Sequence, residues 1–124
     1  MKRTIFPALI LLALAGGCTT SGDKVIVNAE RSIAVSFEAV DTFIQFDHQN
    51  RETMKTKYPD VHKAAEEIRV KAPPLFNSAW AALAAYKAQR TPETGDKLAD
   101  SMAIVENLAR TARQFLLKVN PPAK

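Results

Sequence analysis

Apolar residues recur along three stretches of the chain at the spacing of one helix face. In residues 24–57 they follow one another at intervals of three, four and seven positions, the pattern of an amphipathic helix. Residues 60–89 show the same period on both sides of Pro73-Pro74, which predicts one helix kinked there or two short helices. Residues 92–119 form the third stretch. The positions expected to face the interior in the first and third stretches are Ile26, Ile33, Phe37, Val40 and Ile44, and Leu98, Met102, Val105, Ala109, Ala112, Leu116 and Val119.

Local signals mark the ends of these stretches. Tyr58 precedes Pro59, and a residue before proline is driven away from the helical conformation. Thr91 is a good N-cap, and Pro92 suits the first helical position. Pro121 cannot continue the third helix. Because the connections are short, neighbouring helices should run antiparallel, and the sequence predicts an all-α, elongated up-down-up bundle of three helices.

A different pattern occupies the amino terminus. Two basic residues are followed by an apolar run from Ile5 to Ala15, and small residues then lead to Cys18, the only cysteine. A basic start, a short apolar run and small residues before a cleavage point are the parts of an export signal. The run is about eleven residues, well short of the ~20 that a membrane-spanning helix needs. Residues 1–17 are therefore predicted to be a cleaved signal peptide.

The stretch from Leu14 to Cys18 resembles the lipobox of bacterial lipoproteins. The resemblance implies cleavage between Gly17 and Cys18 and a diacylglyceryl group on the thiol of Cys18. The stretch departs from the usual pattern at Ala15, where lipoproteins mostly carry a larger aliphatic residue. In that family an aspartate after the cysteine marks retention in the inner membrane, so Thr19 implies the outer membrane, facing the periplasm, in a Gram-negative host. The alternative is an ordinary signal peptide that leaves Cys18 as a free thiol, which would invite intermolecular pairing.

The remaining chain is long enough for one small domain. Removing residues 1–17 leaves 124 − 17 = 107 residues, without a second cysteine to form a disulfide. We expect a lipidated cysteine and flexible tether at residues 18–23, a helical domain at 24–119 and a disordered tail at 120–124. Without the two basic residues of the signal, 17 − 2 = 15 basic and 13 acidic side chains remain, a formal charge of +2. This balance does not favour nucleic-acid binding, which needs a clustered basic face.

The helical part offers few candidates for chemistry. His48 and His62 are the only histidines, and two histidines alone are a weak signal for a metal, which needs three or four convergent ligands. We interpret both as solvated surface residues and expect no bound metal or cofactor. Glu66 and Glu67 are adjacent, so on a helix they point about 100° apart and do not form a facing acid–base pair. The sequence holds no nucleophile motif or phosphate-binding loop, and we do not expect an enzyme.

Phe76, Trp80 and Tyr86 place aromatic side chains along the second stretch. At helical spacing such residues usually belong to the core, and the alternative is an exposed interaction surface for a partner. The whole sequence favours a lipid-anchored, non-enzymatic envelope protein that binds a protein partner or a second copy of itself. Its layout looks like that of short helical lipoproteins of bacteria and prophages. Two alternatives remain open: a phage-lysis lipoprotein similar to an outer-membrane spanin subunit, and a small envelope protein that binds a ligand or metal.

Overall fold

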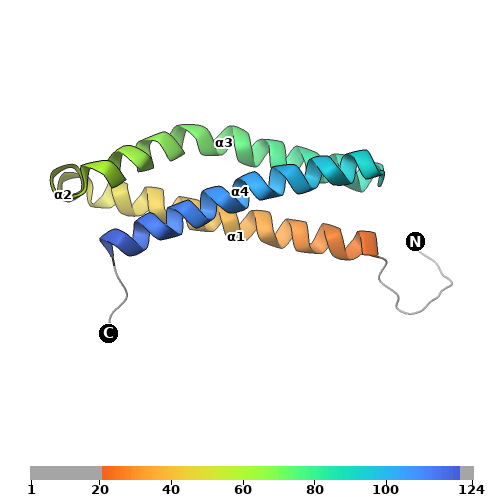
Figure 1. Ribbon diagram of the computed structural model, residues 1–124, viewed down its shortest axis with the longest axis horizontal. Coiled ribbons are helices and arrows are strands. Elements are labelled where there is room, and N and C mark those ends of the chain that lie inside the picture. The colour runs from red at the N-terminus through yellow and green to blue at the C-terminus, as the bar shows by residue number, and fades with distance from the viewer. Residues whose placement is uncertain (1–20, 121–124) are drawn as a thin grey trace.

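The computed structural model describes residues 21–120, and within them every regular element is a helix. The four helices are α1 (Ser21–Gln49), α2 (Arg51–Lys57), α3 (Pro59–Ala88) and α4 (Pro92–Val119). Figure 1 shows α1, α3 and α4 side by side with alternating directions, while the short α2 crosses one end of the assembly. The prediction of an all-α protein is confirmed. The predicted number of three helices is wrong, because a fourth, short helix forms the first corner.

Several predicted features fall outside the described residues. The signal peptide, Cys18 and most of the expected tail belong to residues 1–20 and 121–124. α1 begins at Ser21, which lies inside the tether predicted for residues 18–23.

The helix predicted for residues 24–57 is divided at Asn50, whose backbone leaves the helical conformation (φ −117°, ψ 32°). The side-chain amide of Asn50 donates to the carbonyl of Phe46 at 2.9 Å, and the Met54 amide donates to the Asn50 carbonyl at 2.9 Å. The corner turns α2 so that Met54 is buried in the core. Burying such a side chain contributes about 1.5–3 kcal/mol, which favours the corner over an unbroken helix.

α3 continues through Pro73 and Pro74, so the alternative of two separate helices is wrong. Both prolines are exposed, while Ala72 and Phe76 on the inner side are buried. Proline has no amide hydrogen, so the carbonyls of residues 69 and 70 lack the usual donor four residues on. Burial of the inner side holds the helix together, and α3 bows along its length in Figure 1.

The core fills the space between the three long helices. Phe43 of α1 stacks on Phe115 of α4 with ring centroids 5.7 Å apart and an interplanar angle of 14°. Ala29, Ala109 and Ala112 are fully buried, and such small side chains let helices approach closely. The largest side chains that are almost fully buried are Phe43, Ile33, Met54, Leu83, Leu98, Val61 and Val105.

The turn before α4 is fixed by a reciprocal cap, which matches the local signal in the sequence. The Thr91 hydroxyl accepts from the Thr94 amide at 3.1 Å, and the Thr94 hydroxyl accepts from the Thr91 amide at 3.0 Å. Together these bonds satisfy amides that a helix start otherwise leaves without a partner. The cap explains why α4 begins at Pro92.

Replacing Thr91 by alanine is expected to lower the free energy of unfolding by about 1 kcal/mol, because it removes the N-cap acceptor of α4. Urea denaturation followed by circular dichroism measures the change. Thr53→Ala is the matched control, since Thr53 is exposed within α2 and caps no helix. Equal losses in the two variants would contradict the role assigned to Thr91.

Two exposed ion pairs join the start of α1 to the end of α3. The Arg90 guanidinium donates to Asp23 Oδ1 at 2.7 Å, and Lys87 Nζ donates to Glu30 Oε2 at 3.0 Å. Exposed pairs of this kind contribute about 0–1 kcal/mol each. They help to align the two helices at the end of the molecule where α1 begins.

Candidate functional site

One side of the molecule carries a groove between α1 and α3 that has a polar end and an apolar end. The polar hollow has a volume of about 460 Å³, and the apolar hollow has a volume of about 500 Å³. Both hollows are lined by Ile44, Gln45 and Arg69, so they adjoin one another. The groove brings polar and aromatic side chains of the two helices together on one side of the molecule.

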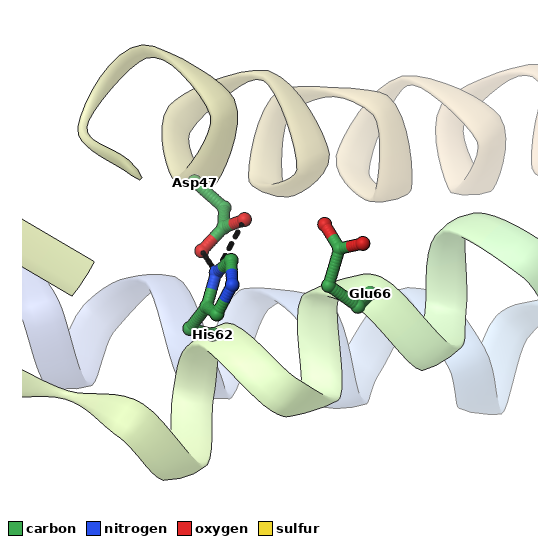
Figure 2. Close-up of side chains that lie close together, drawn as sticks. All are labelled: Asp47, His62 and Glu66. Atoms are coloured by element: carbon green, nitrogen blue, oxygen red, sulfur yellow. Dashed lines mark hydrogen bonds and ion pairs between the residues drawn. The ribbon is translucent and has the colours of Figure 1, made fainter. Parts of the chain in front are cut away.

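The polar end is built around a buried carboxylate. Asp47 lies near the end of α1 with a side chain only 4% exposed, and His62 approaches it from the first turns of α3. His62 Nδ1 lies 2.9 Å from Oδ1 and 3.0 Å from Oδ2 of Asp47, as Figure 2 shows. An ionised carboxylate only accepts hydrogen bonds, so Nδ1 carries the hydrogen and donates it. The contact offsets the cost of burying the Asp47 carboxylate and ties α1 to α3 across the corner.

Glu66 completes this polar cluster from one helical turn beyond His62. Ligand atoms of Asp47, His62 and Glu66 all lie within 4.8 Å of one another. In Figure 2 the Glu66 carboxylate reaches from α3 toward α1, into the space beside the Asp47–His62 contact. Two carboxylates and one imidazole therefore converge from two helices, one residue almost buried and two partly exposed.

Arg69 holds the Glu66 carboxylate in its ionised form. Its guanidinium donates to Glu66 Oε1 at 3.0 Å, and both side chains are substantially exposed. This hydrogen bond is the main cause that lowers the pKa of Glu66; partial burial acts in the opposite direction, and the charges of Arg69 and Arg51 lower the pKa further. Glu66 is therefore a carboxylate at neutral pH and is accessible from the polar hollow.

In the Arg69→Gln variant, the pKa of Glu66 is expected to rise toward the ordinary glutamate value, measured by NMR titration of the carboxyl group. The wild-type pKa is lower in the folded than in the unfolded chain, so the interaction stabilises the fold above the unfolded pKa. That stabilisation is lost as the pH falls through the folded pKa, and the variant should lack it. Lys63→Gln is the control, because Lys63 lies beside Glu66 without lowering its pKa. An unchanged pKa in Arg69→Gln would show that another group sets it.

The apolar end of the groove is framed by aromatic rings. Phe37 is 54% exposed and meets Phe76 edge-to-face, with ring centroids 5.4 Å apart at 88°. Trp80 lies one turn beyond Phe76 and is 43% exposed. Pro73 lines the same hollow. An exposed tryptophan and phenylalanine beside a hollow are typical of a surface that binds an apolar group.

The predicted interaction surface of Phe76, Trp80 and Tyr86 is only partly assembled. Phe76 lies in the core at 4% exposure, and Tyr86 is half-buried close to Gly95 at the start of α4. Trp80 alone remains as an exposed aromatic of that set. Phe37, which the periodicity assigned to the interior, joins it across the groove, because it lies at the edge of the apolar stripe of α1.

The interpretation of both histidines as solvated surface residues is wrong for His62, whose side chain is only 16% exposed. His48 is exposed and lines the polar hollow, and it is not part of the Asp47 cluster. Sequence reasoning missed Asp47, although a signal was present. Asp47 continues the apolar series of Val40 and Phe43 at a spacing of four residues, and a carboxylate on an apolar stripe requires a partner.

Within residues 21–120, none of the helices combines the length and the apolar character needed to cross a membrane. Searches for resemblance to known protein families, to curated proteins and to solved structures found no match for this chain.

Proposed function

We propose that the chain is a non-enzymatic lipoprotein of the cell envelope that is anchored through Cys18 and works by binding a partner. The carrying observation is the order of features in residues 1–18, where a basic start, a short apolar run and small residues end at the only cysteine. In a Gram-negative host, Thr19 after the cysteine favours the outer membrane. The lack of a longer apolar run favours lipid as the anchor.

The start of α1 supports a close attachment to the membrane surface. Within the described residues α1 begins at Ser21, which follows Cys18 by three positions in the sequence. Three residues span at most about 10 Å, so the helices would stand directly on the lipid headgroups. The end of the bundle with Asp23 and Arg90 would face the membrane, and the α2 corner would be the far end.

The groove between α1 and α3 supports binding as the mode of action. Phe37 and Trp80 are exposed beside an apolar hollow on a face that α4 does not cover. A protein partner, or a second copy of the chain, would remove these two rings from water. Sedimentation of the detergent-solubilised chain and of a Trp80→Ala variant tests the second copy. Exclusively monomeric wild-type protein would count against self-association.

Intact-mass spectrometry of the protein extracted from envelope membranes tests the anchor. We expect a species that begins at Cys18 and carries two or three acyl chains. A mature species that begins at another residue, or a Cys18 with an unmodified thiol, would refute the proposal.

A further inference from the structure

We propose that Asp47, His62 and Glu66 form a binding site for a divalent transition-metal ion of the zinc type. The three side chains come from α1 and α3 and place their ligand atoms within 4.8 Å of one another. The combination of one imidazole and two carboxylates suits zinc and its neighbours, which accept nitrogen and oxygen ligands together. This inference does not rest on the lipid anchor, and either proposal can fail alone.

The distances are close to those that a bound ion requires. Zinc binds nitrogen and oxygen at about 2.0–2.2 Å, which places tetrahedral ligands about 3.5 Å apart. Asp47 and His62 lie 2.9 Å apart through a shared hydrogen, so the ion would replace that hydrogen, which leaves to solvent, while the pair opens by about 0.6 Å and Glu66 moves closer. Glu66 is the ligand best able to move, because it is partly exposed and forms its ion pair with the exposed Arg69.

The surroundings of the cluster favour a cation that is reached from solvent. The carboxylate of Asp47 is almost buried, and a divalent cation beside it would compensate its charge. The polar hollow of about 460 Å³ adjoins Asp47 and Glu66 and has room for water molecules that complete the coordination. Arg51 and Arg69 also line this hollow, and both are exposed, so their guanidinium groups can turn to solvent when an ion binds.

His62 holds the position of a ligand whose ring is already oriented. The contact of Nδ1 with the Asp47 carboxylate turns the imidazole toward α1 before an ion binds. Glu66 follows His62 by four residues on α3, so both side chains lie on the same face of the helix. The fold thus fixes two members of the site before any ion arrives.

Zinc titration of the full-length chain in detergent, against a competing chromogenic chelator, tests the site. The Glu66→Gln variant is expected to bind zinc about tenfold more weakly or worse, because it removes a charged ligand. Glu67→Gln is the matched control, since Glu67 is adjacent and exposed and lies outside the cluster. Its affinity should equal that of the wild type. His62→Asn should lose binding, whereas His48→Asn should keep it.

Thermal unfolding keeps the test decisive if His62→Asn fails to fold. Excess zinc should raise the Tm of the wild type and of Glu67→Gln, and it should raise the Tm of Glu66→Gln less. Equal zinc affinity in Glu66→Gln and Glu67→Gln overturns the site. So does a wild-type chain whose Tm does not respond to about 0.1 mM free zinc. Loss of binding in His48→Asn alone would place zinc on the surface of the groove and also overturn it.

Discussion

Cys18→Ser is expected to abolish acylation and either to release the mature chain from the detergent phase of an envelope extract or to leave the chain unprocessed with its signal peptide. A serine hydroxyl does not accept the diacylglyceryl group that the lipobox resemblance implies for the thiol. Each methylene buried in a bilayer contributes about 0.8 kcal/mol, and two or more acyl chains make attachment effectively permanent. Loss of the chains therefore removes the whole anchoring free energy. Fractionation combined with intact-mass spectrometry measures both effects.

Thr20→Ser is the matched control for this experiment, because it makes a comparably small change two residues away and leaves Cys18 intact. It should be acylated like the wild type. A Cys18→Ser chain that retains an acyl mass, or a processed one without its signal peptide that stays in the detergent phase, would show that the anchor lies elsewhere.

Phe43→Ala is expected to lower the free energy of unfolding by about 3–5 kcal/mol, the largest loss among the substitutions considered for stability. Phe43 is fully buried in α1 and stacks on Phe115 of α4, so truncation leaves a cavity between two helices that cannot close it. A domain of this size commonly has 5–15 kcal/mol in total, so the variant should lose a large part of its stability. Urea denaturation of wild type and variant gives the difference directly.

Phe37→Ala offers a control of the same chemistry on the same helix. Phe37 is exposed and keeps one edge-to-face contact with Phe76, which is worth about 0.5–1.5 kcal/mol. Its loss should therefore be several times smaller than that of Phe43→Ala. Similar losses for the two variants would mean that the packing described for α1 and α4 is incorrect.

The sequence predicts those elements whose ends are set by local chemistry. Thr91 and Pro92 start α4 through a cap that acts within one turn, and Pro59 ends the preceding segment by a steric clash with its neighbour. The corner at Asn50 has no such signal, because residues 24–57 contain neither glycine nor proline. Burial of Met54 in the core, where α2 packs against α3 and α1, favours that corner, and periodicity within one helix does not contain this information.

In the candidate site, too, the sequence predicts what depends on local helical spacing and does not predict what depends on the packing of helices. Helical spacing correctly places Phe76 on the inner face of α3, yet it does not distinguish the centre of an apolar stripe from its edge, where Phe37 lies. The pairing of Asp47 with His62 depends on how α1 and α3 are aligned across the corner. A polar residue at an apolar position indicates that it has a hydrogen-bonding partner, but only the folded structure shows which residue that partner is.

The missing amide hydrogens at Pro73 and Pro74 weaken the backbone hydrogen bonding of α3 near its middle, although the helix is continuous. The turn beginning at Arg69 is held by two fewer backbone hydrogen bonds than an uninterrupted helix would have, so α3 should bend more easily there. Arg69 borders both hollows of the groove, and flexing at this level would alter their widths together.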